Sequence, residues 1–257
     1  MPGISVAQAL ATVAPSPERT LVIDIECSPH IARTFDLWNA NIAPSNIIER
    51  SRMLCFAAKW RGEKKVHFAS EFHDGRDAML DLMWRLLDEA EVLVTYNGPK
   101  FDVPVMQREL VLAGFPPPSP WINVDLLRVV KRRFRFASNR LGEVAQELGL
   151  GGKVETSAGL WPRCMAGDEA AWRSMKRYNI GDVRLTEQLL ERLGGGWAPT
   201  PHAGLWSGNR ACCWSCGSSD LVFAGSTIHT GKRWRKLRCG SCGATSRVAA
   251  DGSTVRA

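Results

Sequence analysis

The sequence contains no run of 18 or more apolar residues, so no segment is long enough to cross a membrane as an apolar helix. Its first 20 residues lack the basic start and the continuous apolar stretch of a secretory signal peptide. We therefore expect a cytoplasmic protein whose eight cysteines are thiols or metal ligands rather than disulfides. Internal repeats and low-complexity tracts are also lacking, while an apolar content of 45% can fill a core.

Acidic residues are scarce at the C-terminal end. Residues 197–257 carry eight Lys or Arg residues and two Asp, which gives them +6 of the total net charge of +7. A basic appendage on a nearly neutral body favours a polyanionic partner, usually nucleic acid. A basic tail that only confers solubility would have the same composition.

Turn and linker residues divide the chain. The stretch Gly194-Gly195-Gly196-Trp197-Ala198-Pro199 follows a long helical pattern and indicates a helix end and a linker. We expect four parts, which are an N-terminal extension (1–19), a main domain (20–194), a linker (195–210) and a cysteine-rich module (211–257).

The main domain alternates between strand and helix patterns. Apolar periodicity predicts strands at 21–26, 53–60, 65–69, 92–96 and 122–124, and helices at 76–90, 101–114, 125–134, 140–148 and 167–193. Three strands without intervening helices, followed by strand–helix alternation, predict an α/β fold. Its mixed five-stranded sheet is expected to have helices on both faces.

Two carboxylates share the first predicted strand. Asp24 and Glu26 lie two residues apart in LVIDIEC, so both side chains project from one face while Ile23 and Ile25 project from the other. Two like charges so close in an apolar strand repel each other, and a divalent cation between them would remove that penalty. A strand with one wet face would explain them equally well.

Two further acidic positions lie at helices. Asp102 follows the turn residues Asn97-Gly98-Pro99 and opens a helix, where an Asp is commonly only a cap. Asp182 lies four residues after Tyr178, on a helix stripe that otherwise carries apolar residues. An Asp in a core-facing stripe is costly unless it pairs with a charge or binds a metal, and Tyr178 could orient a water molecule beside it.

In this combination the chain resembles the DEDD (DnaQ-like) 3′–5′ exonucleases, in the subgroup that uses tyrosine. The histidine subgroup would require His at the position of Arg177. The second motif is most similar to that in the exonuclease domains of family B DNA polymerases. The three motifs, in chain order, are Asp24-Ile25-Glu26, Asn97 through Asp102, and Tyr178 through Asp182.

The resemblance implies a ribonuclease H-like fold, in which the first three strands are antiparallel and the later ones are parallel to the first. It also implies two Mg²⁺ or Mn²⁺ ions, which carboxylate oxygens suit. Asp24, Glu26 and Asp182 would bind the ion that carries the attacking water. Asp24 would bridge to the second ion at the leaving 3′-oxygen, and Asp102 would act mainly through water. Tyr178 would orient the nucleophilic water, because a phenol with a pKa of about 10 is a poor base.

The cysteine-rich module carries two Cys-x₂-Cys pairs separated by 22 residues. Such pairs place four thiolates around one structural Zn²⁺, and the segment resembles a zinc ribbon with a small hairpin between its knuckles. Cys212 could replace Cys213 as a ligand. We interpret Cys27, Cys55 and Cys164 as ordinary residues. The four expected ligands are Cys213, Cys216, Cys239 and Cys242.

Between the two pairs, basic residues alternate with Trp234. Basic groups can contact phosphates while a tryptophan stacks on a base. Near the main site, Asn97 and Lys100 could contact phosphate, although a turn residue and a solvated lysine would look the same. Asp125 is more typical of a helix cap. The predicted contacts in the module are Lys232, Arg233, Trp234, Arg235, Lys236 and Arg238.

The sequence therefore predicts a two-metal 3′–5′ exonuclease that acts on single-stranded 3′ ends, with DNA favoured over RNA and the ribbon assisting substrate binding. Alternatives are a ribonuclease or structure-specific endonuclease of the same fold, or a catalytically inactive nucleic-acid-binding protein. Proofreading would require a separate polymerase, replication or repair partner. The layout resembles small proteins of bacteria or their phages.

Overall fold

The computed structural model describes residues 17–35, 41–152, 156–157 and 159–256. The described chain forms two compact units, one of Arg19–Arg192 and one that contains Leu193–Ala257. Most of the predicted N-terminal extension, up to residue 16, lies outside the described residues. None of the helices in the described part of the chain is both long and apolar enough to cross a membrane.

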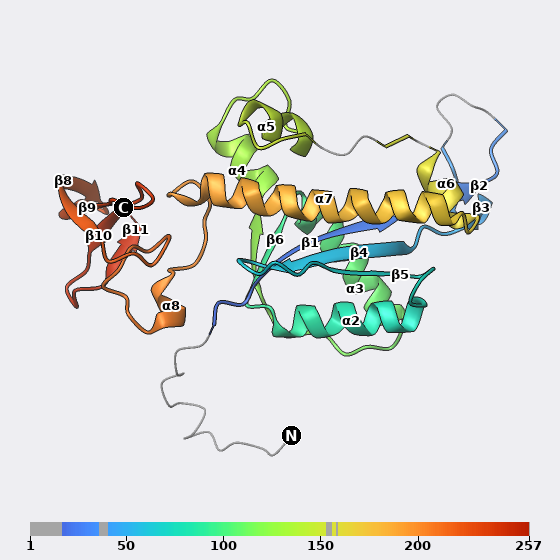
Figure 1. Ribbon diagram of the computed structural model, residues 1–257, viewed down its shortest axis with the longest axis horizontal. Helices are drawn as coiled ribbons and strands as arrows, with labels where there is room; N and C mark the ends of the chain where they lie inside the picture. The colour runs from blue at the N-terminus through green and yellow to red at the C-terminus, as the bar shows by residue number, and fades with distance from the viewer. Residues whose placement is uncertain (1–16, 36–40, 153–155, 158, 257) are drawn as a thin grey trace, which may run out of the picture. The chain divides into compact units, whose positions relative to one another are not determined.

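The first unit is built on a mixed five-stranded sheet in the order β5-β4-β1-β6-β7 (Figure 1). β1 pairs antiparallel with β4, and β4 with β5, whereas β6 and β7 run parallel to β1, which confirms the expected strand directions. A separate two-stranded ribbon joins β2 and β3. The strands are β1 (Thr20–Cys27), β2 (Ile31–Ala32), β3 (Ile47–Glu49), β4 (Met53–Trp60), β5 (His67–Ser70), β6 (Val92–Thr95) and β7 (Ile122–Asp125).

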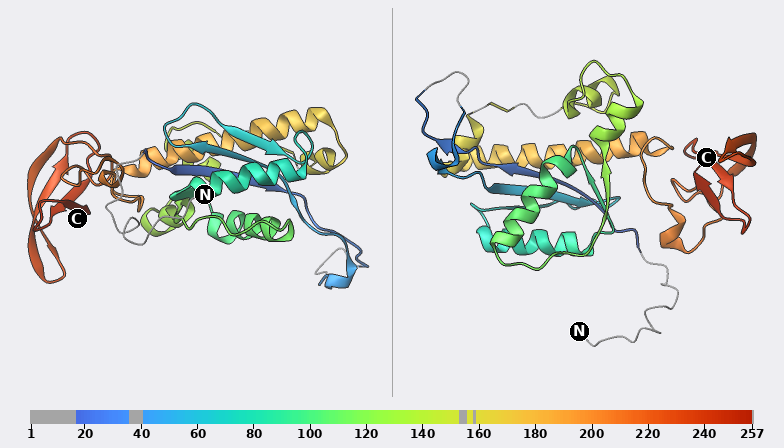
Figure 2. Two further views of the ribbon diagram at one scale, coloured as in Figure 1. Left: turned by 90° about the horizontal axis from the view of Figure 1, so that it is seen from below. Right: turned by 180° about the vertical axis from the view of Figure 1, so that it is seen from behind.

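Helices cover both faces of this sheet, as expected (Figures 1 and 2). Ile23 and Ile25 point to the face where α2 and α3 supply Met83 and Met106 to one buried cluster. On the other face, α6 and α7 pack Trp172 and other apolar residues against the sheet. The helices of this unit are α2 (Arg76–Glu89), α3 (Asp102–Leu112), α4 (Leu126–Arg133), α5 (Leu141–Glu147), α6 (Leu160–Met165) and α7 (Glu169–Gly194).

α7 is fixed along the sheet by an apolar stripe and by charge pairs. Met175 and Leu189 are fully buried, as their helical spacing predicts. The ammonium of Lys59 in β4 pairs with Glu187, and Arg61 pairs with Glu191 at 2.9 Å. These contacts hold the register of α7 against β1 and β4, and so fix the height at which its polar residues meet the sheet.

The second unit contains a short helix, α8 (Gly204–Ser207), and a four-stranded antiparallel sheet in the order β11-β10-β9-β8. β8 and β9 form the hairpin expected between the two cysteine pairs. A bulge interrupts β8 between Phe223 and Ser226, where Gly225 has a φ of +88°. The strands are β8 (Leu221–His229), β9 (Lys232–Cys239), β10 (Thr245–Val248) and β11 (Thr254–Arg256).

A buried carboxylate ties α3 to β4. Glu109, only 1% exposed, accepts hydrogen bonds from the Met53 N–H at 3.3 Å and from Arg108 at 2.6 Å, and it pairs with Arg76. Burial alone would raise the pKa of Glu109, but the two arginines and the N–H outweigh it and lower the pKa. The ionised form is therefore the one that the fold stabilises.

Replacing Glu109 should destabilise the protein in a pH-dependent way. Because the folded-state pKa is lowered, the contribution of Glu109 is full above its unfolded pKa and is lost as pH falls through the folded value. We expect Glu109→Gln to cost about 2 kcal/mol of unfolding free energy at neutral pH, and less towards pH 3. Urea denaturation at both pH values measures this. Asp81→Asn, in an exposed pair with Arg85, is the control. A cost that does not change with pH would contradict this account.

Candidate functional site

Three carboxylates meet where β1 faces α7. The side chains of Asp24 and Glu26 in β1 and of Asp182 in α7 bring oxygens within 4.8 Å of one another. Ile23 and Ile25 occupy the opposite face of the strand, so the alternation read from the sequence holds here. Asp182 is only 3% exposed. Asp24 and Glu26 are half-buried, so the site is open to solvent at the strand and closed at Asp182.

A buried asparagine holds the first of these carboxylates. Asn179, fully buried on α7, donates its side-chain N–H groups to Asp24 Oδ2 at 2.7 Å and to the Asp24 backbone carbonyl at 3.1 Å. The Cys55 thiol lies 3.9 Å from the amide oxygen of Asn179. Two hydrogen bonds from one amide fix both the strand backbone and the carboxylate plane of Asp24.

An indole holds the second carboxylate. Trp161 in α6 donates from Nε1 to Glu26 Oε2 at 3.0 Å. Its ring meets Tyr178 edge to face, with the ring centroids 6.0 Å apart. Tyr178 is 8% exposed and lies one helical turn before Asp182. One side chain thus positions both a carboxylate and the tyrosine.

Asp102 lies beside β1 but is not one of the three converging carboxylates. β1 pairs with β6 only from Thr20 to Val22, so the strand continues past its neighbour. Asp102 accepts the Ile25 N–H at 3.2 Å, where a further strand would otherwise pair. Burial raises the pKa of Asp102 to about 6, against the lowering effect of this hydrogen bond.

The turn before α3 is held from β7. Asn97 has a left-handed backbone, with a φ of 75°, and its N–H donates to Asp125 at 2.9 Å. Asp125 also accepts the Leu127 N–H at 3.0 Å, so it caps α4 as its position in the sequence indicates. Gly98 packs so closely on Thr95 that an added Cβ would lie 2.2 Å from the threonine hydroxyl. Lys100 is exposed.

The carboxylate site fits divalent cations. Three carboxylates this close repel one another, and the burial of Asp182 strengthens the repulsion that it meets. Their oxygens are the hard ligands that Mg²⁺ and Mn²⁺ prefer. Asp24, Glu26 and Asp182 are the residues that would hold such ions.

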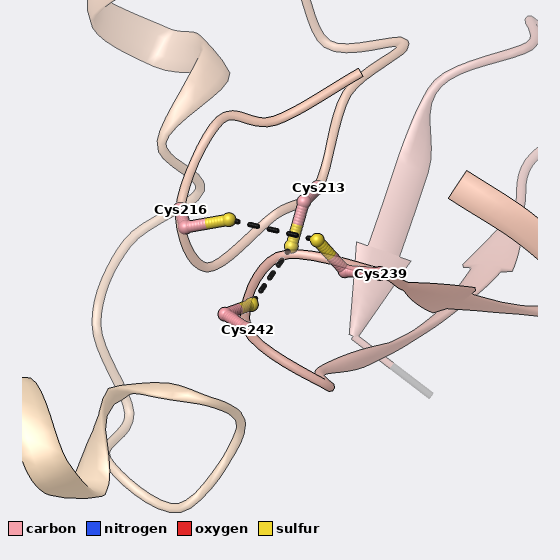
Figure 3. A group of neighbouring side chains, drawn as sticks. All are labelled: Cys213, Cys216, Cys239 and Cys242. Carbon is pink, nitrogen blue, oxygen red and sulfur yellow. Dashed lines mark hydrogen bonds between the residues drawn. The ribbon is translucent and has the colours of Figure 1, made fainter. Parts of the chain in front are cut away.

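The four predicted cysteines also converge, as Figure 3 shows. The Sγ atoms of Cys213 and Cys242 lie 3.6 Å apart, and those of Cys216 and Cys239 lie 3.7 Å apart. A tetrahedral ion with metal–sulfur bonds of about 2.3 Å requires sulfur–sulfur separations of about 3.8 Å. The spacing therefore fits Zn²⁺ and is far too long for disulfides, whose S–S bond is about 2.05 Å.

The remaining cysteines do not join this cluster. The thiol of Cys212 donates to the Asn209 carbonyl at 3.0 Å, so Cys213 occupies the ligand position. Within the cluster, burial opposes ionisation of Cys239, but backbone N–H groups of Cys242 and Ser241 bring its pKa down to about 7. Burial raises the pKa of Cys27 to about 12 and that of Cys164 to about 11, and Cys55 is fully buried.

All six nucleic-acid contacts predicted in the ribbon lie on β9, and strand alternation divides them between its two faces. Arg233 and Arg235 share one face. The other face carries Lys232, Trp234, Lys236 and Arg238.

A family model described as the RNase H superfamily matches residues 49–194, which is more than half of the chain. The chain belongs to the RNase H superfamily. The matched segment begins after β1 and includes Asp102, Tyr178 and Asp182. No curated protein matches the sequence.

The fold of the first unit matches a domain of a solved polymerase structure. A family B DNA polymerase from the hyperthermophilic archaeon Pyrobaculum calidifontis is 20% identical, with a TM-score of 0.53 over 70% of this chain. The match spans only 25% of the polymerase, and at this identity it shows the fold alone. The RNase D of Trypanosoma brucei is 17% identical, with a TM-score of 0.47 over 70% of this chain and 58% of its own.

Two residues of this RNase H-like site are missing from the sequence prediction. Asn179 is four residues after Met175 in the buried stripe of α7, so a polar side chain at a core position was an available signal. Trp161 lies in a six-residue helix without a useful periodicity, and nothing in its surroundings marked it.

Removing the Asn179 amide should weaken metal binding at the carboxylates. Partners that orient a ligand typically contribute 10–100-fold to metal affinity. We expect Asn179→Ala to raise the Mn²⁺ dissociation constant by about tenfold or more, as measured by isothermal titration calorimetry. Met175→Ala, which opens a cavity on the same helix without contacting the carboxylates, should lower thermal stability and leave Mn²⁺ affinity unchanged. Equal Mn²⁺ affinity in wild type and Asn179→Ala would count against this role.

The cysteine cluster should bind one zinc ion per chain. Cys213→Ser removes a clustered thiolate and is expected to abolish stoichiometric zinc in the purified protein. Cys212→Ser, one residue away, keeps a hydroxyl that can reach the Asn209 carbonyl and should retain zinc. Elemental analysis of both variants measures this, and the reverse pattern would assign the site to Cys212.

Proposed function

We propose that the chain is a metal-dependent 3′–5′ exonuclease of the tyrosine-containing DEDD type, with DNA as the favoured substrate. The observation that supports this most is the convergence of Asp24, Glu26 and Asp182, with Tyr178 one turn before Asp182 on the same helix. The RNase H-like fold supports a nuclease, and the order and spacing of the three motifs favour exonucleolytic chemistry.

Each side chain has a distinct part in this proposal. Two divalent cations bound here would supply positive charge to the attacked phosphate and to the leaving oxygen. Asp24, Glu26 and Asp182 would hold them, while Asn179 and Trp161 orient the first two carboxylates. Asp102 keeps the end of β1 in place and contributes through water. The Tyr178 hydroxyl orients the attacking water.

The substrate assignment rests on two further features. The segment from Asn97 to Asp102 resembles the exonuclease domains of family B DNA polymerases, which favours a single-stranded 3′ end of DNA. The ribbon supplies basic residues and a structural Zn²⁺, and it assists binding in this proposal. A ribonuclease or a structure-specific endonuclease of the same fold is the main alternative.

Digestion of labelled nucleic acids separates these alternatives. Single- and double-stranded DNA and RNA, labelled at the 5′ end, are incubated with the full chain in Mg²⁺, in Mn²⁺ or without added divalent ions. A 3′–5′ exonuclease shortens the labelled strand one nucleotide at a time. Internal cuts, or degradation of RNA alone, would contradict the DNA exonuclease, and no degradation under any condition would indicate a binding protein.

Substitutions in the carboxylate site should lower the nuclease rate by different amounts. Asp24→Ala and Asp182→Asn are expected to lower the rate at least about a thousandfold, because metal positioning fails. Tyr178→Phe should be milder, about 10- to 100-fold, with Mn²⁺ affinity unchanged. Glu169→Gln, an exposed carboxylate on the same helix whose pair with Arg173 stays within the helix, is the matched control. Undiminished nuclease activity in purified Asp24→Ala or Asp182→Asn would refute the assignment.

A further inference from the structure

The two faces of the β8–β9 hairpin differ in the side chains that they expose to solvent. Residues that pair directly across antiparallel strands project to the same side of the sheet. Arg233 pairs with Ile228, Arg235 with Ser226, and Leu237 with Phe223. We define the Phe223 face as Phe223, Ser226, Ile228, Arg233 and Arg235.

This face combines exposed apolar groups with cations. Phe223 is 66% exposed and Ile228 is 72% exposed. The guanidinium of Arg235 lies over the Phe223 ring, 5.7 Å from its centroid. Arg233 and Arg235 are both exposed, and neither has an acidic partner in the described part of the chain. Apolar side chains exposed next to guanidinium groups that have no acidic partner are typical of a binding surface.

On the opposite face, the one aromatic side chain of β9 already contacts other residues of the ribbon. Trp234 donates its indole N–H to the His229 carbonyl at 3.2 Å, and the guanidinium of Arg247 lies over its ring at 5.4 Å. Trp234 is only half-exposed. Each of the two rings has a guanidinium over it, so the difference lies in exposure. Phe223 is 66% exposed and Trp234 is half-buried, and the stacking role that the sequence assigned to Trp234 therefore suits Phe223 better.

Phe223 and Arg235 are diagonal neighbours on one face, because Phe223 pairs with Leu237 and Arg235 lies two residues before it. One extra residue in β8, at the positive φ of Gly225, increases the local twist of the hairpin. The Phe223 ring and the Arg235 guanidinium lie in contact on this face of the hairpin. The guanidinium lies over one side of the Phe223 ring, and the side chain is still 66% exposed.

We propose that the Phe223 face binds single-stranded nucleic acid, with Arg233 and Arg235 on phosphates and Phe223 stacked on an unpaired base. This rests on the proposed function and deepens it, because it names the face of the ribbon and the form of the substrate. Charge selects a polyanion, and the exposed ring selects unpaired bases, since a duplex keeps its base faces covered by neighbouring pairs.

Binding measurements on the full chain test this proposal. A fluorescently labelled single strand and its duplex are titrated by anisotropy without added divalent cations, at several salt concentrations. We expect Phe223→Ala to weaken single-strand binding about fivefold or more and duplex binding less than about twofold. Val222→Ala, at an exposed residue on the other face, should change neither.

Double substitutions that each remove two positive charges test which face of the hairpin binds nucleic acid. Arg233→Gln/Arg235→Gln should lower the slope of log affinity against log salt by about 1.4, which corresponds to two phosphate contacts on a single strand. Lys232→Gln/Arg238→Gln removes the same charge from the opposite face, and we expect a smaller loss of affinity and slope. Lys64→Gln/Lys65→Gln, in the turn after β4, controls for net charge, and zinc content confirms that each ribbon variant is folded.

Three results would overturn the proposal: equal losses from the two ribbon double variants, no effect of Phe223→Ala, or equal weakening of single strand and duplex by Phe223→Ala. These outcomes are independent of the proposed nuclease function. Failure of that function would appear as absent degradation while the binding differences persist. Failure of the Phe223 face would leave carboxylate-dependent degradation intact.

Discussion

The mutual repulsion of Asp24, Glu26 and Asp182 has to be offset, because their oxygens lie within 4.8 Å of one another and Asp182 is almost fully buried. Much of the first unit serves to hold these charges at that distance. The antiparallel pairing of β1 with β4 sets which β1 side chains face α7. The pairs formed by Lys59 and Arg61 set how far along the sheet α7 lies. A slip of one residue in β1 would exchange the carboxylates for Ile23 and Ile25 and bury the charges in the apolar core.

Two of the side chains that donate to these carboxylates are neutral. Asn179 holds Asp24, and Trp161 holds Glu26. A lysine or arginine in either place would neutralise the carboxylate and lower its attraction for a metal ion. An amide or indole N–H instead fixes the orientation and leaves the negative charge in place. This is the arrangement expected where a site must be rigid and still strongly attract divalent cations.

The residues that periodicity controls were predictable, and those fixed by tertiary contact were not. Strand alternation placed Asp24 and Glu26 together, and helical spacing placed Asp182 in the buried stripe of α7. The zinc site followed from two Cys-x₂-Cys pairs. No local pattern indicated that Trp161 would reach Glu26 across the chain. Trp234 was expected to be available because it lies among basic residues, but alternation alone cannot show that its side chain is half-buried and hydrogen-bonded to the His229 carbonyl.

The two candidate metal sites differ in ligand chemistry, and this has a consequence for how the chain acquires its ions. The carboxylate site offers only oxygen from these side chains, whereas the cysteine cluster offers four sulfurs at tetrahedral spacing. Sulfur strongly prefers Zn²⁺ over Mg²⁺, and exchangeable Mg²⁺ is held by oxygen. A zinc ion bound there would therefore be part of the fold of that small unit, since its buried cluster is built around Cys213 and Cys239. The oxygen site would then be left to exchangeable ions, so that one chain could combine a permanent structural ion with exchangeable ions for the chemistry proposed above.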